Sequence, residues 1–170
     1  PATPTPTTQT PKPAKTTHTT TTVTTPIDSS AIFTAGGADV QAVAGWVQND
    51  FPAFQGKFIK FERCYSMAQS GDGGTSKGFH EACDGKGPTV VVVKTKEGNV
   101  FGGAADQSWA SPYNGRYAAS SAAFMFCISC AGAGQTDPPS QHKPTGQNNK
   151  NAQLHHRAHR PPLGAPNDPL

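Results

Sequence analysis

The spacing of apolar residues along the chain predicts ordered elements only after a long polar stretch. Residues 1–25 contain 13 Thr and 5 Pro, and almost nothing apolar except Val23. A segment of this composition cannot build a hydrophobic core. The pattern changes at Ala38–Asn49, with Asp39 as a candidate N-cap. Here apolar side chains recur at the spacing of one helix face: Val40, Val43, Ala44 and Val47. This stretch is therefore predicted to be a helix.

The middle of the chain predicts strands. Thr89–Lys94 is a β-branched run bounded by turn residues, which is typical of a buried strand. Lys96–Asn99 predicts a hairpin turn, and the glycine pair that follows Val100 and Phe101 indicates a bulge or a close backbone approach. Further strands are expected over Gln55–Met67 and Ala122–Ser129, and a short helix is expected to end at Phe79–Cys83. Residues 104–121 are expected to form a loop, and residues from 131 onward to be irregular, with one strand near 153–156.

The same central residues carry a family resemblance. Their order is Phe79-His80, Cys83 to Thr89, Val100 to Gly103, Ser108-Trp109 and Ala123 to Phe126. This order resembles a TLDc domain, most of all the divergent type of protists and algae. The resemblance begins near Trp46, includes Cys64-Tyr65, and continues loosely to Pro162-Leu163-Gly164. It implies a mainly β fold, an antiparallel β-sandwich with a few short helices, and it carries over no catalytic residues.

The chain is therefore divided into an extended arm over residues 1–26 and a TLDc-like domain over 27–170. Within the domain, residues 46–130 match the family best. TLDc-like domains usually continue beyond the stretch that resembles Pro162-Leu163-Gly164 and add a further strand. We expect the shorter end of this chain to leave a sheet edge with unpaired backbone groups. The start at Pro1, without Met or a signal peptide, is expected for a processed mature chain.

Charge and composition exclude two classes of partner. The formal net charge is only +3, and basic residues form no dense stripe with interleaved aromatics, so nucleic-acid binding is not expected. No stretch approaches the roughly 18 apolar residues of a membrane span. Weakly basic ends around a weakly acidic centre favour contact between subunits.

Four cysteines, Cys64, Cys83, Cys127 and Cys130, are candidates for disulfides. An even number in a small Thr- and Pro-rich protein is typical of secreted proteins, and three pairings are open. The alternative is four reduced thiols in a cytosolic domain. Cys127-x-x-Cys130 also has the spacing of a redox or metal pair, but its place on a predicted strand favours a structural disulfide.

The arm has the composition of an O-glycosylated, mucin-like stalk with polyproline II character. No N-glycosylation sequon occurs, so any carbohydrate is expected to be O-linked. An unmodified linker is the alternative. The candidate O-glycosylation sites are Thr3, Thr5, Thr7, Thr8, Thr10, Thr16, Thr17, Thr19, Thr20, Thr21, Thr22, Thr24 and Thr25.

At the end of the arm, Val23, Ile27, Ile32 and Phe33 lie among Thr and Ser in a β-capable context. This segment is either the first strand of its own domain or a strand given to the open edge of a neighbour. As polyproline II, 25 residues span about 75 Å, which is enough to reach another subunit. Donation from one copy to the next predicts a head-to-tail homopolymer, and contacts of this kind that do not close form filaments.

Three residue clusters contain side chains or glycines that chemical sites use. His155-His156-x-x-His159 has metal-ligand spacing, but prolines follow it and no helical pattern supports it, so no metal site is expected. The glycines around Lys86 lack phosphate-loop spacing, and no cofactor is expected. His80, Glu81 and Asp84 form an acidic and basic cluster without an evident nucleophile, so enzyme activity is not expected.

Trp109, Tyr113 and Tyr117 lie in an aromatic and polar stretch of the kind that stacks on sugars. They are candidate glycan contacts, with core packing as the alternative for Trp109.

The sequence thus predicts an extracellular, non-enzymatic glycoprotein that assembles through its arm into a filament or surface array. A carbohydrate-binding or adhesion module on a mucin-like stalk is one alternative. The other is an intracellular TLDc-like protein, since such relatives are linked to oxidative-stress protection and to the vacuolar proton pump.

Overall fold

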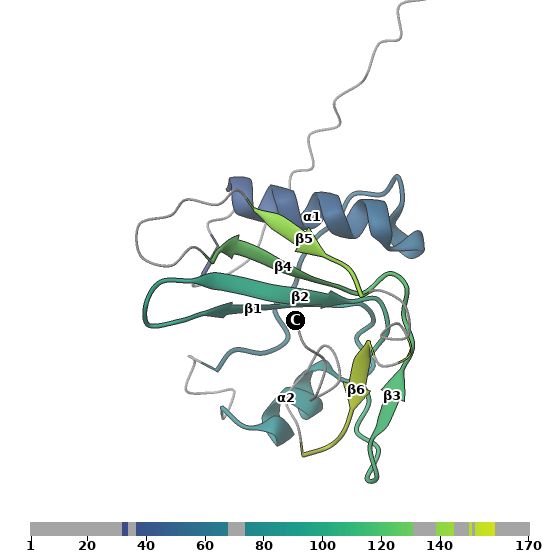
Figure 1. Ribbon diagram of the computed structural model, residues 1–170. Coiled ribbons are helices and arrows are strands. Elements are labelled where there is room, and N and C mark those ends of the chain that lie inside the picture. The colour runs from purple at the N-terminus through teal and green to yellow at the C-terminus, as the bar shows by residue number, and fades with distance from the viewer. Residues whose placement is uncertain are drawn as a thin grey trace, which may run out of the picture.

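The structure is a computed structural model. It describes residues 32–33, 37–67, 74–130, 139–144, 150 and 152–158. Two antiparallel sheets and two α-helices make up this part of the chain, so the predicted mainly β class is confirmed. Helix α1 lies on one side of the larger sheet, while helix α2 and the smaller sheet lie on the other (Figure 1).

The larger sheet contains four strands in the order β1-β2-β4-β5, and all neighbours are antiparallel. They span Thr89–Lys94 (β1), Val100–Ala105 (β2), Phe124–Ser129 (β4) and Ser140–His142 (β5). The predicted β1–β2 hairpin is confirmed, because the amide of Thr95 donates to the carbonyl of Asn99 at 2.9 Å. Gly98, in this turn, has a φ of 91°, a backbone conformation that favours glycine.

Helix α1 (Ala38–Asp50) packs against one face of this sheet. Its predicted apolar residues are buried as expected, and Trp46 lies with its ring centroid 6.3 Å from that of Phe124 and 6.2 Å from that of Phe126. The prediction that Asp39 caps the helix is wrong, because Gly37 is the N-cap and no side chain caps it. Asp39 lies in the first turn instead, where its carboxylate interacts favourably with the helix dipole.

The opposite face of the sheet carries α2 (Ser76–Cys83) and a two-stranded sheet of β3 (Arg116–Ala118) and β6 (Gln153–His155). The N-cap of α2 is Thr75, whose hydroxyl accepts from the amide of Gly78 at 3.0 Å. One hydrophobic core lies on the α1 side of the larger sheet and a second core lies on the α2 side. Successive residues of β2 pack into different cores, because side chains alternate across a strand. Ala104 belongs to the α1-side core, and Ala105 packs with Phe79, Cys83 and Trp109 on the other side.

The strand predicted over Gln55–Met67 is not present, and this prediction is wrong. A short 3-10 helix, Pro52–Phe54, follows α1, and residues 58–66 then run without ladder pairing. Ile59 packs in the α1-side core, whereas Cys64 and Tyr65 pack on the α2 side. The segment therefore passes from one face of the sheet to the other, which explains its imperfect alternation of apolar residues.

Two short strands lie where irregular structure was expected. Strand β3 falls in the predicted loop 104–121, and β5 falls in the region after residue 131. Each has only three residues, too few to produce a recognisable alternation. The strand expected near 153–156 is confirmed as β6.

The predicted arm lies outside the described residues, as do its threonines, Val23 and Ile27. Ile32 and Phe33 are described. Phe33 is only 7% exposed and belongs to the core of its own chain, and Ile32 packs against the same core. Their placement fits the alternative that this end of the segment serves its own domain. Within the described part of the chain, no helix has the length and apolar character needed to cross a membrane.

Candidate functional site

All four cysteines are oxidised, in the pairs Cys64–Cys83 and Cys127–Cys130. This result confirms the predicted disulfides and selects one of the three open pairings. Cys64–Cys83 joins the segment that passes around the sheet to the last residue of α2, across 19 positions of sequence. Cys127–Cys130 closes a short loop at the end of β4.

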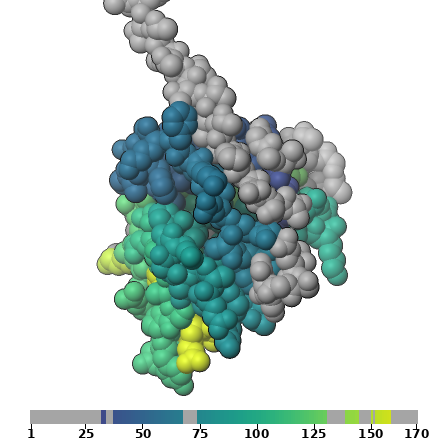
Figure 2. Space-filling model, turned by 180° about the vertical axis from the view of Figure 1, so that it is seen from behind, coloured from purple at the N-terminus to yellow at the C-terminus, as the bar shows by residue number. Residues whose placement is uncertain are grey.

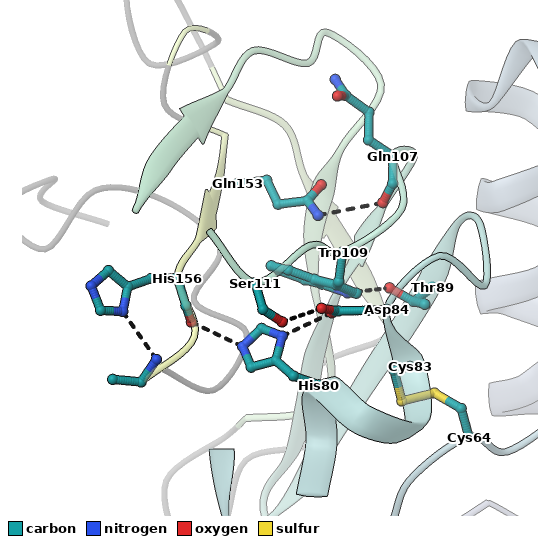
Figure 3. Close-up of polar contacts among 11 residues, drawn as sticks. Cys64, His80, Cys83, Asp84, Thr89, Gln107, Trp109, Ser111, Gln153 and His156 are labelled. Carbon is teal, nitrogen blue, oxygen red and sulfur yellow. Dashed lines mark hydrogen bonds and ion pairs between the residues drawn. A yellow bond between two sulfur atoms is a disulfide. The ribbon is translucent and has the colours of Figure 1, made fainter. Parts of the chain in front are cut away.

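The residues next to Cys83 form a polar network around His80 and Asp84 (Figure 3). The two residues are four positions apart, which brings their side chains together at the end of α2. The Nδ1 atom of His80 lies 2.8 Å from Oδ1 of Asp84, and Nε2 donates to the backbone carbonyl of His156 at 2.9 Å. The His80 side chain is 6% exposed and that of Asp84 is 26% exposed. His80 therefore links α2 to the chain just after β6.

A strap over residues 108–112 completes the network. The hydroxyl of Ser111 donates to Oδ2 of Asp84. The indole N–H of Trp109 donates to the hydroxyl of Thr89 at 2.6 Å, and the backbone carbonyl of Trp109 accepts from the amide of Gly85 at 3.1 Å. These bonds fix the strap across the end of α2 and the start of β1.

His80, Asp84 and Ser111 are the residue types of a hydrolytic triad, but they are connected differently. In such a triad the serine is hydrogen-bonded to histidine, whose other nitrogen is bonded to the carboxylate. Here Ser111 bonds to Asp84, and Nε2 of His80 faces a carbonyl, which can only accept. That nitrogen therefore carries a proton and has no lone pair with which to activate Ser111. The network can hold three segments together, but it provides no activated serine.

His155, on β6, is a buried imidazole without a hydrogen-bond partner at either ring nitrogen in the part of the chain that the structure describes. It is 2% exposed. Its ring centroid lies 5.7 Å from that of Trp109. Burial lowers the pKa of His155 below its ordinary value, and the positive charge of Arg116 lowers that pKa further. The structure therefore favours the neutral form of this ring.

The neighbouring His156 does not combine with His155 in a metal site. Successive strand residues point to opposite faces, and the Nδ1 atom of His156 accepts from the amide of Ala158 at 3.0 Å. No group of three potential metal ligands occurs among the residues that the structure describes. His159, the third histidine of the motif, lies outside them.

The predicted aromatic contacts separate into one buried and two exposed side chains. Trp109 is 2% exposed and packs in the α2-side core, so the prediction that it contacts glycans is wrong and its core-packing alternative holds. Tyr113 is 76% exposed and Tyr117 is 42% exposed. The guanidinium of Arg157 lies over the Tyr113 ring, 5.2 Å from its centroid.

Ser111, Arg157 and the carbonyl of His156 were missed by the sequence analysis. Each acts through a partner far away in the sequence: Ser111 through Asp84, Arg157 through Tyr113, and His156 through His80. His80 and Asp84 were named from the sequence because they lie close together along the chain. No comparable spacing marks the other three.

The family comparison agrees with this architecture. The family model described as the TLDc domain matches residues 42–168, which is well over half of the chain. No curated protein and no solved structure matches the chain. The match covers both disulfides, the His80–Asp84 network and both sheets, and the chain belongs to the TLDc domain family.

Proposed function

We propose that this chain is an extracellular, non-enzymatic structural protein. In this proposal its TLDc domain is the folded unit of an assembly, and its Thr- and Pro-rich arm carries O-linked glycans. The observation that carries the proposal is the oxidation of all four cysteines into two disulfides. Disulfides form and persist in secreted proteins, whereas the reducing cytosol keeps thiols free.

The polar network supports the non-enzymatic part of the proposal. Every ring nitrogen of His80 and both carboxylate oxygens of Asp84 are engaged within the chain. A general base needs a free lone pair within reach of its substrate, and His80 does not offer one. The network is suited to stabilising the fold.

Two features support assembly through the arm. Strands β1 and β5 lie at the ends of the four-strand order, so each pairs on only one side with another described strand. Edge strands accept an additional strand from another chain. Because Phe33 is held in its own core, the donated strand would be the preceding stretch around Val23 and Ile27. The product is a head-to-tail homopolymer, a filament or a surface array.

Intact mass spectrometry of the natively sourced chain tests the proposal. We expect no cysteine to be alkylated before reduction and four to be alkylated after it. We also expect a mass above that of the sequence, spread in sugar-sized steps, and fibrils in negative-stain images. Four free thiols, an unmodified mass and dispersed monomers would instead support an intracellular role, such as that of relatives linked to oxidative stress or the proton pump.

A further inference from the structure

The small sheet has one face that the described residues leave partly exposed. In the antiparallel pair of β3 and β6, Tyr117 lies opposite Leu154, and Arg116 lies opposite His155. Because side chains alternate, Tyr117 and Leu154 lie on the face opposite to the buried His155. His156 follows on the same outward side as Leu154. This outward face of β3 and β6, together with the adjoining turn at Tyr113, is called the ribbon surface below.

Aromatic rings dominate the exposed part of the ribbon surface. Tyr113 and Tyr117 are two of the five large apolar or aromatic side chains that are exposed in the described part of the chain. Tyr113 lies at a turn in which the amide of Gly115 donates to the carbonyl of Pro112 at 3.4 Å. In Figure 2 the yellow end of the described chain lies beside the green segment that precedes it, at the end of the molecule away from α1. Figure 1 places β3 and β6 at this same end.

The charge of the ribbon surface is positive. Arg157 is exposed and forms no ion pair with a described residue. Arg116 pairs with His155 along the two strands and therefore lies on the opposite face of the small sheet. The segments 107–118 and 152–158 contain no Asp or Glu. Asp84, which lies behind the surface, is already bound by His80 and Ser111. A partner at this surface therefore meets the Arg157 guanidinium with no competing carboxylate on the same segments.

The stacking of Arg157 on Tyr113 leaves the N–H donors of the guanidinium available to a ligand. A cation–π contact uses the face of the planar group, while its N–H donors lie in the plane and point outward. These donors match the two oxygens of a carboxylate. An exposed tyrosine ring presents an apolar face, which packs against the C–H face of a sugar, and a polar hydroxyl.

We propose that the ribbon surface binds a carboxylated sugar chain, an acidic polysaccharide built from uronic acids. Tyr113 and Tyr117 pack against the sugar rings, and Arg157 binds a carboxylate. The chemistry of the surface fits this partner better than a protein, because a stable protein interface needs a much larger apolar area. It also fits better than nucleic acid, because a single guanidinium group neutralises few phosphates.

Titration calorimetry with the disulfide-intact full chain tests this proposal. The probes are a galacturonate hexasaccharide, a neutral galactose hexasaccharide and a thymidine hexanucleotide. We expect the uronate to bind, its affinity to fall with added salt, and the other two probes to bind at least about tenfold more weakly. Equal binding of the neutral sugar, tighter binding of the nucleotide, or no binding of the uronate overturns the proposal.

Single substitutions locate the site. Tyr113→Ala and Arg157→Gln should each weaken uronate binding about tenfold, whereas Tyr113→Phe, which keeps the ring, should bind like the parent chain. The matched controls are Phe58→Ala, since Phe58 is 73% exposed elsewhere, and Lys96→Gln in the β1–β2 turn. Controls that lose affinity as much as the test variants would show general charge or surface effects and would overturn the assignment. Circular dichroism confirms that each variant is folded.

Discussion

The carbonyl oxygen of Val91 occupies the place where a side chain on Gly102 would begin. A Cβ atom built on Gly102 overlaps that oxygen and comes within 2.6 Å of the Phe126 ring. Val91 is on β1 and Phe126 is on β4, so β2 fits between its neighbours only with glycine at this position. The β2–β4 register also shifts between Val100 and Phe101, just before this glycine. Of the two alternatives predicted from the glycine pair, a bulge or a close backbone approach, the close approach is present.

Replacing Gly102 with alanine should therefore be strongly destabilising. We expect Gly102→Ala to lower the free energy of unfolding by more than about 2 kcal/mol, because backbone must move to admit the methyl group. Gly45→Ala is the matched control. Gly45 lies within α1 and has nothing within 4 Å of its built Cβ, so alanine should raise the unfolding free energy by about 0.5–1 kcal/mol. Urea denaturation measures both, and a similar effect of the two substitutions would contradict the close approach.

The two disulfides should differ in what they contribute to stability. In the chain-entropy account, closing the longer Cys64–Cys83 loop stabilises by about 3 kcal/mol and closing the short Cys127–Cys130 loop by about 2 kcal/mol. Cys83 is also fully buried. Urea midpoints of the Cys64→Ala/Cys83→Ala and Cys127→Ala/Cys130→Ala double variants should show a larger loss for the first. A larger loss in the Cys127→Ala/Cys130→Ala variant would mean that Cys64–Cys83 does not hold residues 58–66 to α2.

Removal of the Asp84 charge should loosen the attachment of β6. Asp84→Asn keeps the size of the side chain but loses the charge-assisted bond to His80, and we expect a loss of about 1–2 kcal/mol in unfolding free energy. Because His80 also bonds the carbonyl of His156, amide hydrogen exchange in β6 should accelerate.

Glu62→Gln is the control for Asp84→Asn. It breaks the exposed Lys60–Glu62 ion pair, which is expected to contribute little to stability because water screens both charges. Equal losses in the two variants, or unchanged exchange in β6, would show that the His80–Asp84 pair does not hold the small sheet.

The buried His155 should make stability depend on pH. The pKa of His155 is lowered in the folded chain, so in mildly acidic solution the unfolded chain binds more protons than the folded one. The contribution of His155 is complete above its ordinary pKa of 6.5 and is lost as pH falls below that value toward the lower, folded pKa. The urea midpoint should therefore be lower at pH 5 than at pH 7.5.

His155→Phe should remove part of this pH dependence, because phenylalanine does not titrate. The exposed His142→Gln is the control and should leave the pH profile of the parent chain unchanged. If the two variants gave the same profile, the acid sensitivity would not come from the buried ring.

Local patterns predicted the elements whose stability is decided locally. The spacing of Val40 and Val47 predicted α1, and the β-branched run Thr89–Lys94 predicted β1 with its observed bounds. The glycine at position 98 predicted the hairpin turn, because the positive φ there is a property of single residues. The family resemblance of the central stretch was also visible in residue order alone.

The tertiary structure decided what depends on distant partners. The sequence supplied four candidate cysteines, but it left open whether they pair and which of three pairings they form, until folding brought Cys64 to Cys83. The sequence left two roles open for Trp109, a glycan contact or a core residue. The packing of Phe79 and Cys83 around its ring places Trp109 in the core. In the same way, Ser111 and His156 acquire their roles only when α2, the strap and β6 meet. A residue's own chemistry is local, whereas burial and hydrogen-bond partners are set by contacts between segments far apart in the chain.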